Sequence, residues 1–283
     1  MKDILGLISP GKPFLPDALN AMQLGHANAM RHLWLTAAVS LFAERVGGIR
    51  ILEVGSWMGA SVLTWAAAID RFIAGEGEIL SVDTWAPYLG ADDINADGSY
   101  RVMDRAAAVD LAYAVFRHNA SCVPKKVRVD HLRGRSKDVL SMLRERAFDI
   151  VYIDGSHYYA DVAADLAEGR RLVAEGGLLC GDDLEQQLTE VDEAYARANI
   201  DRDAVIDPKN RKPYHPGVTL AVAEALGPVS AYTGFWAMRR EGDRFMPVDL
   251  SGAAPFLPGH FSEEYRKTVL DWARSSGFFQ KQA

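Results

Sequence analysis

The chain has little of several features that mark specialised environments. Only two of its 283 residues are cysteine, which is too few for a disulfide framework. No stretch reaches the roughly 18 apolar residues of a membrane span. The N-terminal sequence MKDILGLISPGKPFLP has no apolar core typical of a signal peptide. We therefore expect a cytoplasmic protein with no membrane partner.

The chain also has fewer basic than acidic residues. The 31 Lys and Arg residues are outnumbered by 38 Asp and Glu residues, so the formal net charge is −7. Binding to nucleic-acid phosphates needs a basic surface, and we therefore expect no nucleic-acid partner. Hydrophobic residues at 49% and charged residues at 24% are typical of a globular protein with a sizeable core.

From residue 49 onward, strand-like apolar runs alternate with helix-like runs. IRILEVG, GEILSVDTW, KVRVDHLRG, FDIVYID and LLCGDD read as strands, and helical patterns separate them. Strands that alternate with helices predict a doubly wound, mostly parallel sheet with helices on both faces. Near the end, only Gly242 and Asp243 separate two β-like runs, SAYTGFWAMRRE and RFMPVDL. Such a tight turn predicts an antiparallel edge.

The two ends of the chain differ from this central pattern. Residues 1–48 read as a helical addition with a rough apolar stripe of Leu33, Ala37, Leu41 and Val46, and residues 251–283 hold one helix near 262–276. We assign 1–48 to an N-terminal cap, 49–250 to the main domain and 251–283 to a C-terminal extension. Within the main domain, a helix is expected over 100–119 and a polar surface loop over 201–217.

The first candidate site is the turn in ILEVGSWMGAS, which follows the first strand. Its glycines, Gly55 and Gly59, allow the backbone to approach a ligand closely. The dinucleotide fingerprint needs a further glycine where Trp57 stands, which disfavours a pyrophosphate. Asp83 ends the next strand, where its carboxylate can hold ribose hydroxyls, and Glu53 lies near the turn. A ligand with ribose but no phosphate fits this pattern, although both glycines could serve only tight packing.

The second candidate site combines carboxylates with a histidine. Asp154 ends the fourth strand and the pair Asp182–Asp183 ends the fifth, so the three carboxylates should meet at one edge of the sheet. A hard divalent cation such as Mg²⁺ would relieve their repulsion. His157 lies three residues after Asp154 and suits a general base, because imidazole titrates near neutral pH. The alternatives are a turn at Asp154, a helix cap at Asp183 and a solvated histidine.

With these residues in place, the chain resembles a class I S-adenosylmethionine-dependent methyltransferase. The resemblance implies that Gly55 and Gly59 border the methionine part of the cofactor and that Asp83 binds its ribose. Ser136, in the GRS motif after the third strand, would border the adenine. Trp85 would stack there, although an aromatic residue just after a strand is as often plain packing.

A narrower resemblance rests on FDIVYIDGSHYYADVAADL followed by GGLLCGDD. This pair is similar to the metal-dependent macrocin O-methyltransferase and cephalosporin-hydroxylase-like group, over roughly residues 49–240. It implies that Asp154, Asp182 and Asp183 are metal ligands, that Asp154 also borders the cofactor, and that His157 is the base. The first residue of the acidic pair is often Glu in this group, and Asp182 has a shorter arm.

The resemblance implies a seven-stranded sheet and transfer of a methyl group from S-adenosylmethionine to a hydroxyl of a small molecule. Mg²⁺ would assist, and the acceptor would be a sugar, a polyketide or a phenolic compound. The segments 86–99 and 201–217, together with the N-terminal helices, are expected to shape the acceptor pocket, and a homo-oligomer is possible. The alternatives are a metal-independent or N-directed methyltransferase on the same fold, and a methyltransferase-like protein that binds the cofactor and assists a partner enzyme.

Overall fold

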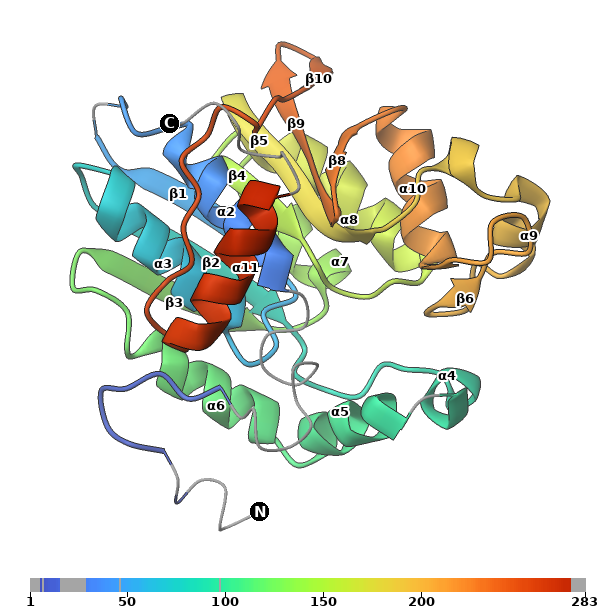
Figure 1. Ribbon diagram of the computed structural model, residues 1–283, viewed down its shortest axis with the longest axis horizontal. Helices are drawn as coiled ribbons and strands as arrows, with labels where there is room; N and C mark the ends of the chain where they lie inside the picture. Colours follow the sequence, from blue (N-terminus) through green and yellow to red (C-terminus); the bar gives the residue numbers. More distant parts are fainter. Residues whose placement is uncertain (1–5, 7, 16–28, 46, 97, 276–283) are drawn as a thin grey trace.

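The structure is a computed structural model that describes residues 6, 8–15, 29–45, 47–96 and 98–275 (Figure 1). Val46, the last member of the expected N-terminal stripe, lies outside these ranges. Within the described part of the chain, no helix is long and apolar enough to cross a membrane.

A mixed sheet forms the centre of the molecule, with the strand order β10-β9-β5-β4-β1-β2-β3. The strands are β1 (Ile49–Val54), β2 (Gly77–Asp83), β3 (Val127–Arg133), β4 (Phe148–Ile153), β5 (Val173–Leu184), β8 (Ser230–Tyr232), β9 (Gly234–Glu241) and β10 (Arg244–Pro247). The first five run parallel, whereas β9 is antiparallel to β5, and both β8 and β10 pair antiparallel with β9. The doubly wound sheet and its antiparallel edge are thus confirmed.

The expected number of seven strands differs from the structure by one. Among the described residues the sheet has eight strands, because the run 230–241 is divided into β8 and β9. Thr233 and Gly234 have φ angles of 55° and 100°, and these left-handed conformations turn the chain back on itself. The tight turn at Gly242 and Asp243 joins β9 to β10 as predicted.

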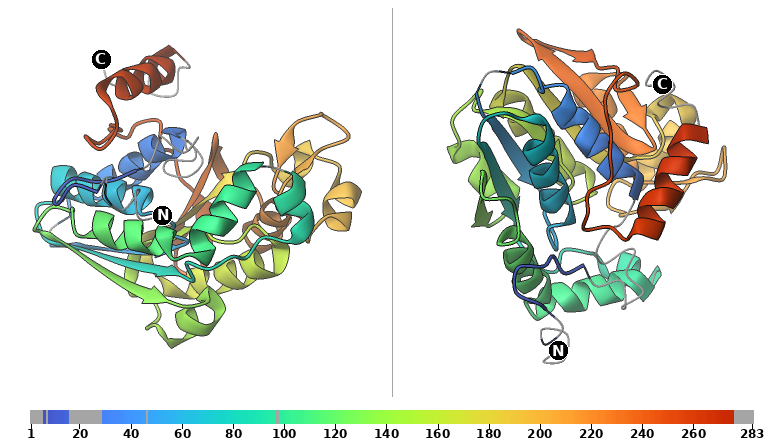
Figure 2. Two further views of the ribbon diagram at one scale, coloured as in Figure 1. Left: turned by 90° about the horizontal axis from the view of Figure 1, so that it is seen from below. Right: turned by 60° about the vertical axis from the view of Figure 1, so that its left-hand side comes forward.

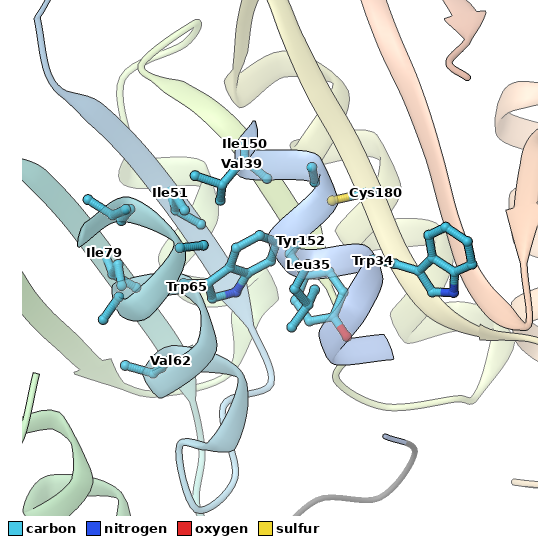
Figure 3. Close-up of a cluster of buried hydrophobic side chains, with 14 of the residues drawn as sticks. Trp34, Leu35, Val39, Ile51, Val62, Trp65, Ile79, Ile150, Tyr152 and Cys180 are labelled. Atoms are coloured by element: carbon cyan, nitrogen blue, oxygen red, sulfur yellow. The ribbon is translucent and has the colours of Figure 1, made fainter. Parts of the chain in front are cut away.

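Helices cover both faces of the sheet (Figure 2). One face packs against α2 (Ala29–Ser40), α3 (Ala60–Phe72) and α6 (Leu111–Ala120), with Trp65 and Tyr152 in its core (Figure 3). The other face packs against α7 (Ser136–Val139), α8 (Tyr159–Leu172) and α10 (Pro216–Leu226). Consecutive residues on β4 alternate between the two cores, Ile150 facing the first and Val151 the second. This alternation is the pattern of a central strand that is buried on both faces.

The two ends of the described chain pack on the same side of the sheet. Trp34 of α2 donates its indole N–H to the hydroxyl of Thr233 (3.0 Å), and the Thr36 hydroxyl donates to the carbonyl of Phe256 (2.9 Å). The helix α11 (Glu263–Ser275), predicted near 262–276, lies outside α2 and packs on Leu33 (Figure 2). The boundaries at residues 48 and 250 stay a prediction, but α2 belongs to the main core.

Two segments are more structured than the sequence indicated. The helix expected over 100–119 is divided at Asp110 (φ 57°) into α5 (Gly98–Ala108) and α6, and α4 (Ala91–Ala96) lies in the expected loop 86–99. The polar segment 201–217 holds a small hairpin of β6 (Val205–Ile206) and β7 (Pro213–Tyr214), after α9 (Glu193–Ala198). Two of its aspartates, Asp203 and Asp207, are buried, which a surface loop does not require.

Candidate active site

The candidate active site lies at the carboxyl ends of β1, β2, β4 and β5. In open α/β sheets this edge is where ligands bind. Asp83 is the last residue of β2, Asp154 follows β4, and Asp182 and Asp183 lie near the end of β5. The sequence therefore predicted correctly which strand ends bring these carboxylates together.

The turn after β1 is held by its own backbone geometry. Gly55 has φ 85°, and a Cβ atom at this position would collide with the backbone carbonyl of Asp154. Its amide N–H donates to the carbonyl of Val82 (2.9 Å). Gly59 also has a positive φ of 83°, immediately before α3. Both glycines are thus explained by backbone conformation, and their contact with a cofactor stays a prediction.

Asp83 fastens this turn to β2. One carboxylate oxygen accepts the amide N–H groups of Ser56 and Trp57, each at 2.9 Å, and the other accepts the amide of Trp85 at 2.7 Å. Burial raises the pKa of Asp83, and these backbone hydrogen bonds oppose that shift. Both carboxylate oxygens thus already accept backbone N–H groups, and ribose binding by Asp83 stays a prediction.

Two other expected cofactor residues are buried beneath the turn. Glu53 accepts hydrogen bonds from the Ser56 hydroxyl (2.6 Å) and the Trp65 indole (3.2 Å), and burial raises the pKa of Glu53 to about 7. The Trp85 ring is 1% exposed, packs against Phe116 and donates to the carbonyl of Trp57 (2.6 Å). The expected stacking of Trp85 on adenine is not what the structure shows, because its ring is part of the core.

Ser136 begins α7, as its position after the third strand suggested. Near it lies Asp165 of α8, a carboxyl group that the sequence analysis missed. Burial raises the pKa of Asp165 to about 7, and a hydrogen bond with Ser136 opposes that rise. The only sequence signal for Asp165 was an acidic residue on a helix face that is otherwise apolar. The contact of Ser136 with adenine stays a prediction.

The carboxylates Asp154, Asp182 and Asp183 surround Arg31 of α2. Its guanidinium lies 2.6 Å from an oxygen of Asp154 and 3.6 Å from one of Asp183, and it forms a close ion pair with Asp182. The Arg31 and Asp154 side chains are each only 12% exposed. The sequence motifs contain no Lys or Arg near these aspartates, but the fold supplies one from far upstream.

An irregularity in β5 lets the neighbouring residues Asp182 and Asp183 both contact the guanidinium of Arg31. The pairing of β5 with β9 shifts between Gly181 and Leu184, and Asp183 has φ 61°. In a regular strand, consecutive side chains point to opposite faces. The bulge and the left-handed residue change this alternation, and such backbone strain is common at functional sites.

The donor set suits a hard divalent cation. Asp154, His157 and Asp183 each offer a ligand atom, and these atoms lie within 4.8 Å of one another. Within the described part of the chain, the buried Oδ1 of Asp182 has no hydrogen-bond partner. Burial raises the pKa of Asp182 to about 7, even with Arg31 beside it. Arg31 therefore does not fully compensate for the burial of Asp182, and these residues would accommodate a cation next to Arg31.

His157 lies between two carboxylates. Its Nε2 is 2.9 Å from Asp183 and its Nδ1 is 3.0 Å from Asp203, while the His215 ring lies 4.5 Å away, centroid to centroid. Burial lowers the pKa of His157, but the negative neighbours, Asp183 foremost, outweigh burial and hold the pKa well above its usual value. The imidazole is therefore protonated in this arrangement at neutral pH.

The two segments expected to shape the acceptor pocket meet beside His157. Asp93 of α4 accepts hydrogen bonds from the Tyr158 hydroxyl and the Arg202 guanidinium, both at 2.9 Å. The Tyr100 hydroxyl of α5 donates to Asp203 at 2.6 Å. Sequence reasoning missed Asp203 and His215, and their only signal was the charged and aromatic content of a segment that was interpreted as loop.

Residues 52–184 match the profile of a family described as a methyltransferase domain. No curated protein matches the chain. Among solved structures, the O-methyltransferase NovP is 17% identical, covers 75% of this chain and 80% of its own, and has a TM-score of 0.51.

Two further structures are less similar in shape. The calicheamicin methyltransferase CalS11 is 16% identical over 79% of this chain and 84% of its own, with a TM-score of 0.46. TomG from Streptomyces achromogenes, an O-methyltransferase in complex with S-adenosylmethionine, is 17% identical over 80% and 86%, with a TM-score of 0.42. Residues 52–184 therefore match a methyltransferase domain, and NovP shares the fold.

Proposed function

We propose that the protein transfers a methyl group from S-adenosylmethionine to a hydroxyl group of a small molecule. The observation that carries this proposal is the position of His157 and the acid cluster at the same sheet edge as the Gly55 turn and Asp83. NovP, which shares the fold, is described as an O-methyltransferase. A sugar, a polyketide or a phenolic compound would suit a pocket built from α4, α5 and the β6–β7 hairpin.

The reaction would be a single displacement at the methyl carbon. The acceptor oxygen forms a bond to that carbon while the carbon–sulfur bond breaks, so S-adenosylhomocysteine leaves with the electron pair. The hydroxyl proton passes to Nε2 of His157, which must first have released its own proton. Much of the rate would come from holding the oxygen and the methyl group in line.

The carboxylates of Asp154, Asp182 and Asp183 would hold a divalent cation such as Mg²⁺. When bound, such an ion lowers the pKa of a coordinated hydroxyl and supplies the missing positive charge. The residues themselves keep this edge polar, and Arg31 orients Asp154 and Asp182 by pairing with one oxygen of each.

A metal-independent methyltransferase is a second candidate, favoured by one observation. Arg31 already contacts all three carboxylates and neutralises part of their charge without any ion. In that case Asp154 and Asp183 would contact the acceptor directly. An N-directed reaction, and a cofactor-binding protein that assists a partner enzyme, remain alternatives with no particular support from the site.

The test is turnover with purified protein, S-adenosylmethionine and a panel of sugar, polyketide and phenolic acceptors, measured as S-adenosylhomocysteine released. His157→Ala should lower the rate by about 10²–10⁴-fold while S-adenosylhomocysteine still binds in calorimetry. His118→Ala, a histidine on α6 away from the site, should keep its rate. Because the pKa of His157 is raised, the wild-type rate should increase as the pH rises above the usual titration range of histidine. A His157→Ala rate within twofold of wild type would remove the base assignment.

A further inference from the structure

A buried carboxylate, Asp203, lies directly against the proposed base. It stands between α9 and β6, and its side chain is 1% exposed. Burying a carboxylate is costly unless partners compensate. Its partners in the described part of the chain are side chains of the site: the His157 ring at 3.0 Å, the Tyr100 hydroxyl at 2.6 Å and the His215 ring at 4.0 Å.

The two oxygens of Asp203 have different partners. Oδ1 faces Nδ1 of His157, whereas Oδ2 accepts the hydroxyl hydrogen of Tyr100. Burial would raise the pKa of Asp203, but the neighbouring charges of His157 and His215, with the hydrogen bond from Tyr100, outweigh burial and lower it. Asp203 is therefore a fixed negative charge on the Nδ1 side of the imidazole.

We propose that Asp203 is a positioning residue for His157 and that Tyr100 holds Asp203 in place for this role. The inference rests on the proposed function and adds residues that it does not require. A carboxylate beside Nδ1 favours a proton on that nitrogen. Nε2 faces Asp183 at 2.9 Å and can accept a proton once an acceptor hydroxyl replaces that contact. Nε2 then takes the acceptor's hydroxyl proton while the methyl group moves from sulfur to oxygen.

A second buried aspartate in the same segment shows what a structural carboxylate looks like here. Asp207 accepts backbone N–H groups from Asp192 (2.8 Å), Lys209 (3.0 Å) and Asn210 (2.9 Å). Through these three backbone groups it fastens the β6–β7 hairpin to the start of α9. Asp203 and Asp207 thus form a matched pair, equally buried and close in sequence, of which only Asp203 contacts the base.

The contacts from Tyr100 through Asp203 to His157 also connect α5 to the proposed base. Tyr100 belongs to α5, and the neighbouring α4 is tied to the same segment through the contact of Asp93 with Arg202. The elements expected to surround an acceptor therefore hold Asp203 from one side, and Asp203 holds His157 from the other.

The experiment compares Asp203→Asn, Asp203→Glu, Tyr100→Phe and Asp207→Asn in the full chain. Asp203→Asn should lower kcat at least about tenfold and leave the KM for S-adenosylmethionine within twofold. Asp203→Glu should recover part of that loss, and Tyr100→Phe should show a smaller loss in kcat of the same kind. Asp207→Asn should lower the melting temperature but keep kcat.

A measurement that does not depend on methyl transfer can test the role of Asp203 independently of the proposed function. In ¹⁵N NMR of histidine-labelled protein with S-adenosylhomocysteine, the His157 ring signals should shift in Asp203→Asn and Tyr100→Phe but not in Asp207→Asn. Unchanged His157 signals, or a kcat of both Asp203→Asn and Tyr100→Phe within twofold of wild type, would overturn the positioning role. Shifted signals in a protein that transfers no methyl group would support the positioning and contradict the proposed function. If Asp203→Asn does not fold, Tyr100→Phe and Asp203→Glu decide by the same criteria.

Discussion

Single residues in this molecule carry charges that the surrounding fold must balance. Glu53 shows the effect in its simplest form, because it is fully buried and the nearby charge of Asp83 raises its pKa further. Its partners are the hydroxyl groups of Ser56 and Ser81 and the indole N–H of Trp65. Hydrogen bonds only partly compensate for lost solvation, so the protonated form is favoured near neutral pH.

The raised pKa of Glu53 makes stability depend on pH. An acid whose folded pKa lies above its unfolded value contributes stability that is fully present below the unfolded pKa, here 4.5. That contribution is lost as the pH rises through the folded pKa of about 7. At 1.36 kcal/mol per pKa unit, the loss reaches about 3 kcal/mol.

Glu53→Gln should remove this dependence, because glutamine has the shape and hydrogen-bonding groups of the protonated acid. Relative to wild type, the variant should gain up to about 3 kcal/mol between pH 4.5 and pH 8. Urea unfolding of both proteins at several pH values measures this difference, and Asp165 and Asp182 titrate in both. A difference that stays constant with pH would show that Glu53 is ionised in the folded protein.

At the scale of elements, the turn after β1 depends on its approach to β4. The N–H of Asp154 donates to the carbonyl of Val54 at 2.8 Å, and Gly55 lies against the Asp154 carbonyl. A side chain at Gly55 would push the turn after β1 away from the strand end that carries Asp154. The glycine therefore matters for the spacing of two strand ends as well as for its own backbone conformation.

Gly55→Ala should be strongly destabilising, and Gly176→Ala is the matched control. Gly176 also has a positive φ, of 71°, but a Cβ atom there meets nothing within 4 Å. A left-handed conformation costs alanine roughly 1–2 kcal/mol, and only Gly55 adds a collision with backbone atoms. Denaturant midpoints should therefore fall much further for Gly55→Ala. Equal losses in both variants would mean that the turn relaxes without cost.

The sequence predicted the elements whose pattern is local and missed contacts between distant segments. The order of β1 to β5 and the β9–β10 hairpin follow from apolar runs and a two-residue turn. The split of 230–241 depends on the conformation of Thr233, which carries no residue signal. The local sequence also could not predict that Trp85 is buried, because the residues it packs against lie on α6 and β3. The residues Asp154, His157 and Asp183 were recognised because strand ends in a parallel sheet meet.

At the scale of the whole molecule, α2 places the positive charge of Arg31 in the candidate active site. Arg31 and Asp154 are 123 positions apart, so no local motif could reveal their contact. The helix is anchored by Trp34, Leu35 and Val39 in the main core, which fixes where Arg31 points. The N-terminal segment, which matched no motif, thus takes part in the electrostatics of the site.

Arg31 and a divalent cation would act on the same carboxylates, and this determines how the protein responds to metal. At about 4 Å and an effective dielectric constant near 20, two unit charges interact by about 4 kcal/mol. Removing Arg31 would therefore relieve repulsion toward a second cation and leave the acid cluster less neutralised. After chelation, Arg31→Gln should unfold at a lower temperature than wild type, because buried carboxylates lose their partner.

Added Mg²⁺ should raise the melting temperature of Arg31→Gln more than that of wild type, because an ion that binds only the folded state stabilises it. Arg45→Gln is the matched control, since Arg45 pairs with Asp149 at the opposite end of β4. That variant should respond to Mg²⁺ as wild type does, and Asp183→Asn should not respond. Equal Mg²⁺ shifts in Arg31→Gln and wild type would place any ion outside the cluster. Full wild-type activity after exhaustive chelation would then favour the metal-independent reaction, with Arg31 as the permanent counter-charge of the three carboxylates.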